Sequence, residues 1–312
     1  MLIGKNSESI IDSVLMDDNW KIEYEDNSTT GEADLVETYS GQIAIKKTDE
    51  QKYLGFVLSS KGENMANINQ IKKKSIGLVR KIINRLNSLN LKKYFFECAI
   101  ILMNSMLRPS ILYAAEMYYN LKEPELRQIE RIEESFLRKI LNTTRGCPII
   151  QLYLEIGQYP ARFEIQRMRL LYLKNILEED DESLLRKFFQ LQMDEPTKGD
   201  WASKCILDLK ELKITESLEE ITKMSKTKFS NMVKSKIKLN ALKYLKEKQK
   251  SKGSEICYID IEMADYLLPE NKMLTIDEKQ QLFVVRNCMT EILLKSTRPG
   301  EKPPVYVGVK KA

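Results

Sequence analysis

Two patterns of apolar and polar positions divide the chain. Up to residue 58, short stretches alternate apolar and polar residues, as in Gln-Ile-Ala-Ile-Lys at residues 42–46. This period of two predicts β-strands, at residues 1–4 and 19–26 and within residues 33–46. From residue 64 onward, apolar residues recur every three or four positions, which predicts helices. The expected fold is therefore mainly α, with a small N-terminal β-rich piece followed by helical bundles.

Proline, glycine and polar stretches divide the helical part. Pro109 predicts two helices or one kinked helix, because proline lacks an amide and clashes with the preceding turn. Residues 91–119 are the most hydrophobic stretch, and within it Leu102 and Met106 are expected to be buried. Further helices are expected at residues 125–142, 149–156, 161–179, 183–193, 201–212, 216–224 and 228–250.

One early stretch combines a strand pattern, a turn and a helix pattern. Residues 53–58, Tyr-Leu-Gly-Phe-Val-Leu, predict a strand in which Gly55 marks a bulge or a close approach of another backbone. Ser60 and Glu63 can form a capping box for a helix over residues 64–89. The expected apolar stripe of this helix is Met65, Ile68, Ile71 or Lys72, Ile76, Val79, Ile82, Ile83 and Leu86.

The polar side of this predicted helix carries only positive charge. Its cations are Lys72, Lys73, Lys74, Arg80, Lys81 and Arg85. No acid lies between Asn64 and Leu89. Such a helix fits a phosphate backbone, because neutralising the phosphates releases their counterions. A solvated face without a ligand is the common alternative for a charge run.

A second basic segment lies near the C-terminus. Residues 226–252 contain ten lysines and one glutamate, so this segment carries +9 and the rest of the chain −4, within a total of +5. Its helix is expected to place Phe229, Val233, Ile237, Ala241 and Leu245 on one side. Its candidate nucleic-acid-binding residues are Lys234, Lys236 and Lys238.

Composition excludes several classes of site. The 312 residues suffice for about two globular domains. Histidine is absent, which excludes histidine-based general-base, triad and metal chemistry. The five cysteines include no Cys-x-x-Cys pair, which argues against a Cys₄ zinc site and indicates reduced thiols inside the cell, in cytoplasm or nucleus. There is no glycine-rich phosphate loop, signal peptide or apolar run long enough for a membrane span.

The order of these parts resembles a known enzyme family. The Tyr-Leu-Gly strand, the turn and the basic helix are similar to the palm-to-thumb junction of reverse transcriptases from non-LTR (LINE-type) retrotransposons. Further similar segments are residues 107–114, where a thumb helix breaks at proline, 130–141, 154–157 with Pro160, 167–172, 265–269 and 282–289. Together they are distributed between residues 53 and 289.

The resemblance implies a domain order and a partner. The order is terminal palm strands at residues 1–58, helical thumb at 59–145, helical connection at 146–195, a C-terminal helical region with the Lys-rich helix at 196–296, and a disordered tail at 297–312. Tyr53, Leu54, Gly55 and Phe56 would form the primer-contacting turn. Thumb helices would hold the duplex of RNA template and DNA primer. Alternatively, Tyr53 and Phe56 only pin the sheet to the thumb.

Catalysis in this family needs carboxylates that bind two metal ions. The closest candidates here are Asp17 and Asp18, but residues 1–4 resemble the strand that follows the catalytic hairpin. The pair therefore falls after the active site, and too few residues precede it for a fingers domain. We expect a fragment without catalytic residues or a metal of its own. The missing palm and fingers domains of its parent would use Mg²⁺, and the family's Cys/His zinc knuckle is also absent.

The expected function is to hold the template–primer duplex as part of an RNA-directed DNA polymerase, without catalysing extension alone and without binding a membrane. The rival interpretation is a non-enzymatic helical protein-interaction module of retroelement origin.

Overall fold

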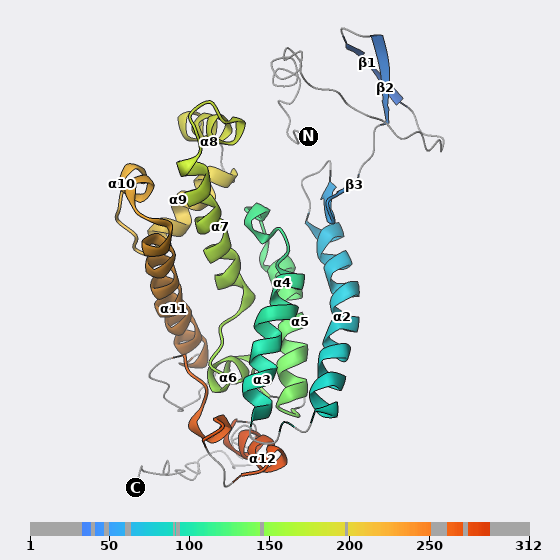
Figure 1. Ribbon diagram of the computed structural model, residues 1–312, viewed down its shortest axis with the longest axis vertical. Helices are drawn as coiled ribbons and strands as arrows, with labels where there is room; N and C mark the ends of the chain where they lie inside the picture. Colours follow the sequence, from blue (N-terminus) through green and yellow to red (C-terminus); the bar gives the residue numbers. More distant parts are fainter. Residues whose placement is uncertain are drawn as a thin grey trace, which may run out of the picture. The chain divides into compact units, whose positions relative to one another are not determined.

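The computed structural model describes residues 33–38, 41–46, 50–59, 64–89, 91, 94–143, 147–196, 199–250, 261–270 and 274–287 (Figure 1). Several predictions lie outside these residues: the strands at 1–4 and 19–26, Asp17, Asp18, the Ser60–Glu63 capping box, the side chain of Tyr53, and the tail at 297–312. The described part is mainly helical, with small antiparallel strand pairs near the N-terminus, as expected.

The chain divides into two compact units, residues 1–70 and 71–312, and helix α2 (Met65–Ser88) begins in the first and continues in the second. Within its described residues, the first unit contains two antiparallel hairpins. One pairs β1 (Ala33–Thr38) with β2 (Gly41–Lys46), and the other pairs β3 (Glu50–Tyr53) with β4 (Phe56–Ser59).

The β3–β4 hairpin corrects the prediction of one strand over residues 53–58. Tyr53 pairs with Phe56, so the chain reverses direction through the two residues between them, Leu54 and Gly55. Their φ angles are +46° and +90°, the signs that a type I′ turn requires. Gly55 therefore marks a turn rather than a bulge. Glycine suits the second position of this turn, because a residue without a Cβ adopts a positive φ without strain.

The helices of the second unit are α3 (Phe95–Leu102), α4 (Arg108–Ile111), α5 (Glu123–Ile140), α6 (Ile149–Glu155), α7 (Ala161–Glu178), α8 (Leu184–Asp194), α9 (Trp201–Glu211), α10 (Leu218–Lys223), α11 (Lys226–Lys250) and α12 (Ile276–Asn287). Those from α5 to α11 begin and end within two residues of the predicted bounds. Helix α7 is central, since it contacts α5, α8, α9, α10 and α11 (Figure 1). No helix among the described residues is long and apolar enough to span a membrane.

The predicted apolar side of α11 is confirmed. Phe229, Val233, Ile237, Ala241 and Leu245 are all fully buried. Residues four apart lie on one face of a helix, so this strict spacing gives a single narrow stripe. Helix α11 contacts both α6 and α7, which the stripe can face.

The burial of Leu102 and Met106 was predicted wrongly. Leu102 is half-buried and Met106 is 45% exposed, whereas Met103 and Leu107 are fully buried. Leu102 precedes the irregular part of the helix, and the four-residue spacing from the buried Ala99 places Met103 on the buried face instead. The shift from Met106 to Leu107 lies within a π-helical turn, η2 (Met103–Leu107), in which the Arg108 amide donates to the Met103 carbonyl. A π-turn adds one residue to the helix and shifts the buried face by one position.

Pro109 explains why the turn widens there. Its ring lacks an N–H for the Ser105 carbonyl, four residues earlier, and would clash with that carbonyl in a regular helix. The π-helical turn lies directly before the proline, and α4 follows with the proline in its first turn. The kink expected at Pro109 is thus accommodated by one inserted residue.

The connection between α6 and α7 depends on a close backbone contact. Gly157 has φ +70°, and a Cβ at this position would lie 2.4 Å from the Met263 amide nitrogen. The Ala264 amide donates to the Glu155 carbonyl at 2.8 Å, and Ile156 and Met263 form an isolated antiparallel bridge. Residues 262–264 therefore pack on the end of α6, and only glycine fits at position 157.

Candidate nucleic-acid interface

Helix α2 exposes every cation that its sequence pattern predicted. Lys72, Lys73, Lys74, Arg80, Lys81 and Arg85 are all exposed. Among the described residues, no carboxylate pairs with any of these six side chains. We call these six residues the α2 cationic face. Its charge is not neutralised within the described part of the chain, so it is available to an external anion.

The opposite side of α2 is buried, with one correction to the predicted stripe. Ile68, Ile71, Val79, Ile82 and Leu86 are buried as expected, whereas Met65 and Ile83 are half-buried. Ile76 is 55% exposed, and the fully buried residue beside it is Ser75. Ser75 follows Ile71 by four positions and precedes Val79 by four, so it lies on the stripe. Ile76 is turned about 100° away from it.

A glycine lies in the middle of the α2 cationic face. Gly77 is exposed, and apart from its chain neighbours and the adjacent backbone of α2, no described atom lies within 4 Å of the position that a Cβ would occupy. Glycine inside a helix destabilises it by roughly 0.5–1 kcal/mol relative to alanine. The packing of the described residues does not account for this cost.

The predicted primer-contacting turn projects an apolar side chain into solvent. Leu54 is 74% exposed and has a left-handed backbone, a conformation that branched side chains rarely adopt. Phe56 is half-buried. Two hydrogen bonds fix the hairpin to the first turns of α2. The Gln70 side chain donates to the Gly55 carbonyl at 3.0 Å, and the Val57 amide donates to the Asn67 side chain at 3.2 Å.

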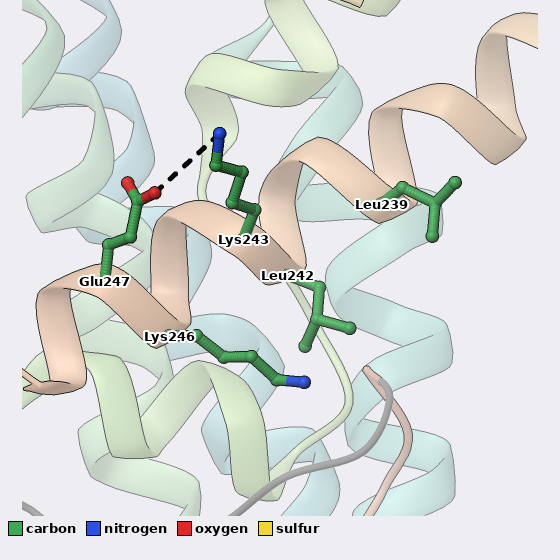
Figure 2. A pocket seen from close by; sticks show the side chains of 5 residues that line it. All are labelled: Leu239, Leu242, Lys243, Lys246 and Glu247. Atoms are coloured by element: carbon green, nitrogen blue, oxygen red, sulfur yellow. Dashed lines mark ion pairs between the residues drawn. The ribbon is translucent and has the colours of Figure 1, made fainter.

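The candidate residues of α11 are less uniformly placed. Lys234 is exposed, whereas Lys236 and Lys238 are half-exposed, and Lys236 donates to the Lys213 carbonyl at 3.4 Å. A shallow depression on α11 is lined by Leu239, Leu242, Lys243, Lys246 and Glu247, and Lys243 and Glu247 approach to 3.9 Å (Figure 2). Acidic and apolar side chains thus interrupt the lysines, and the α2 cationic face is the stronger candidate.

The sequence patterns did not reveal a buried polar cluster that organises the helices. Arg108 donates to Glu133 at 2.8 Å, and the Tyr153 hydroxyl donates to the other Glu133 oxygen at 3.0 Å. Burial raises the pKa of Glu133 above its usual range, although Arg108 and Tyr153 oppose this rise. One signal was available, since Glu133 lies four residues from both Ile129 and Leu137 on the apolar stripe of α5.

Two further arginines connect helices in the same way. Arg169 of α7 pairs with Asp208 of α9 at 2.5 Å, and both are buried. Arg162 of α7 binds Glu130 of α5 at 2.6 Å and stacks on Tyr244 of α11, 5.0 Å from the ring centre. These arginines are committed to structural pairs, which distinguishes them from the cations of α2.

Comparison with known proteins provides no relative, since no family model, curated protein or solved structure matches the chain. Within the described residues, no three acidic or cysteine side chains gather in a group that could hold a metal ion. Only the charge and exposure of the α2 residues themselves indicate an interface.

Proposed function

We propose that this chain binds the sugar-phosphate backbone of a nucleic-acid duplex through the α2 cationic face, in the manner of the thumb of a LINE-type reverse transcriptase. The observation that carries this proposal is a 24-residue helix with six exposed cations and no acid. In this proposal the chain holds the RNA template and DNA primer. Copying RNA into DNA, which reverse transcriptases carry out with Mg²⁺, is not assigned to the α2 cationic face.

The physical basis is counterion release. Each phosphate that a lysine or arginine neutralises steepens the fall of log affinity with log salt by roughly 0.7–0.9. Phosphate contacts position a protein on a duplex but do not read bases. Binding should therefore be sensitive to salt and tolerant of sequence.

The test compares two triple variants of the full chain on an RNA–DNA hybrid, with affinity measured from low to moderate salt. Replacing Lys72, Lys73 and Arg80 with Gln should weaken binding and reduce the salt slope, because three candidate contacts are lost. Glutamine keeps a high helix propensity, so circular dichroism should be unchanged. Replacing Lys234, Lys236 and Lys238 with Gln removes the same charge from α11 and is the matched control.

The outcomes separate the candidate surfaces. If only the α11 variant weakens binding, the interface belongs to α11 and the assignment to α2 is wrong. If the unmodified protein binds no hybrid at low salt, the chain is not a nucleic-acid-binding module.

The second candidate function, a protein-interaction module, is favoured by one specific observation. Four large apolar side chains between α3 and η3 (Ala115–Met117) are about half exposed: Ile101, Met106, Tyr113 and Met117. Exposed apolar residues of this size mark protein contacts when they form a contiguous patch. Absence of nucleic-acid binding at low salt would favour this function.

A further inference from the structure

Gly77 is surrounded on the surface of α2 by positive charge. The surface neighbours of a helical residue are those three and four positions away on either side. For Gly77 these are Lys73, Lys74, Arg80 and Lys81, and all four are exposed. A residue with no side chain thus lies at the centre of two pairs of cations.

The fold of the described residues does not require a glycine there. The backbone of Gly77 is helical, and no described atom occupies the space where a Cβ would project. Close helix packing, the usual reason for a glycine within a helix, is therefore not the explanation. What the missing side chain does provide is a low point between long cationic side chains.

We propose that Gly77 is the floor of a phosphate-binding notch, in which Lys73 and Lys74 hold a backbone phosphodiester from one side and Arg80 and Lys81 from the other. The proposal rests on the proposed function, and it identifies where the nucleic-acid backbone comes closest to α2. The two pairs are seven residues apart, about 10 Å along the helix axis. Lysine and arginine side chains are long enough to reach inward from both sides to a phosphate above Gly77.

The arginine and the three lysines around the notch would bind the phosphate in different ways. Arg80 can donate two parallel hydrogen bonds to one phosphate, whereas the lysines act as flexible point charges. Because Gly77 has no Cβ, a phosphate can approach the helix surface closely at this position. All four cations can then contact the phosphate at once. A side chain at position 77 would push the phosphate outward and leave some of these contacts unmade.

The test uses the full chain with Gly77→Ala and Gly77→Leu, titrated with an RNA–DNA hybrid at low salt. Both variants keep every cation, and both favour the helix more than glycine does, so Tm should rise by roughly 2–4 °C. Affinity should nevertheless fall, slightly for Gly77→Ala and roughly tenfold for Gly77→Leu, equivalent to one lost charge-assisted contact. A loss of affinity together with a gain in Tm is specific to the notch.

The matched control is Asn175→Leu on α7. Asn175 is exposed, and its surface neighbours are Leu171, Tyr172, Glu178 and Glu179, with no cation among them. This variant should also favour its helix but leave affinity unchanged. If Gly77→Leu binds like the unmodified protein while the α2 triple variant loses affinity, the notch is wrong and the proposed function stands. If the unmodified protein binds no hybrid, both are wrong.

Discussion

Arg108 and Glu133 form an ion pair in which the Arg108 Nε lies 2.8 Å from a Glu133 oxygen, and the Glu133 side chain is fully buried. The same guanidinium donates to the Gln158 side chain at 3.0 Å and to the Tyr159 carbonyl at 2.6 Å. Arg108 thus connects the kink before α4 to α5 and to the segment between α6 and α7. Burial alone would lower the pKa of Arg108, but the charge and hydrogen bond of Glu133 raise it overall, so Arg108 stays protonated.

Replacing Arg108 with Met should strongly destabilise the protein. The change leaves Glu133 buried with only the Tyr153 hydroxyl, and removing one partner of a buried pair costs about 3–5 kcal/mol. Urea unfolding measures the loss. Arg127→Met is the control, because Arg127 is half-exposed and its contacts with Glu123 and Glu130 are long, at 4.0 and 3.6 Å. The buried Glu130 keeps its closer partner Arg162 at 2.6 Å, so this change should cost less than about 1 kcal/mol. Equal losses in the two variants would contradict the structural role of Arg108.

The π-helical turn gives a second prediction, with two methionines in one helix. Met103 is fully buried and Met106 is 45% exposed. Met103→Ala should lower the free energy of unfolding by about 2–5 kcal/mol, the usual range for a buried methionine. Met106→Ala should change it by less than about 0.5 kcal/mol, because little buried contact is lost. The reverse order would mean that the helix has no inserted residue before Pro109.

These two helical features also show how far the sequence could predict the fold. The stripe of α11 was predictable because its apolar residues follow one another every four positions with no interruption. The stripe before Pro109 was not, because a period of 3.6 assumes regular hydrogen bonds, and a single i→i+5 turn moves every later residue by one place. Periodicity indicates that a proline distorts a helix but does not give the form of the distortion.

The candidate site was predictable to a similar extent. The charge and spacing of α2 were enough to predict an exposed cationic face. The β3–β4 turn was missed because Leu54 does not favour a type I′ turn, for which asparagine or glycine is usual at that position. Pairs such as Arg108–Glu133, 25 residues apart in sequence, depend on tertiary packing, which local patterns do not encode.

A third prediction concerns pH. Glu164 of α7 accepts hydrogen bonds from Arg167 and from the Tyr159 hydroxyl. Burial would raise the pKa of Glu164, but the hydrogen bonds and charge of Arg167 outweigh it and hold this pKa below its usual value of 4.5. The ionised carboxylate therefore stabilises the fold above pH about 4.5, and this contribution is lost as pH falls through the lowered pKa.

Glu164→Gln should consequently be less stable than the unmodified protein at neutral pH, and the difference should narrow at acidic pH. Urea unfolding at pH 7 and at successively lower pH measures this change. Glu179→Gln, at the exposed end of the same helix, is the control and should leave the pH dependence as it is. A difference that stays constant with pH would show that the Glu164 carboxylate does not stabilise the fold through its charge.

The last prediction concerns Leu54 at the tip of the β3–β4 hairpin. A left-handed backbone costs a residue with a Cβ roughly 1–2 kcal/mol, and asparagine tolerates this conformation better than leucine. Asn-Gly is also a favoured type I′ pair. Leu54→Asn should therefore strengthen the hairpin by up to about 1 kcal/mol, which hydrogen exchange of the amides at residues 50–59 can detect.

If the tip of the hairpin contacts the primer, Leu54→Asn should also weaken binding of an RNA–DNA hybrid by about fivefold, since about 1 kcal/mol of apolar contact is lost. Leu54→Met keeps the apolar side chain and the backbone cost, so it should change neither property. An asparagine variant with a stronger hairpin and undiminished affinity would show that Leu54 does not contact the nucleic acid.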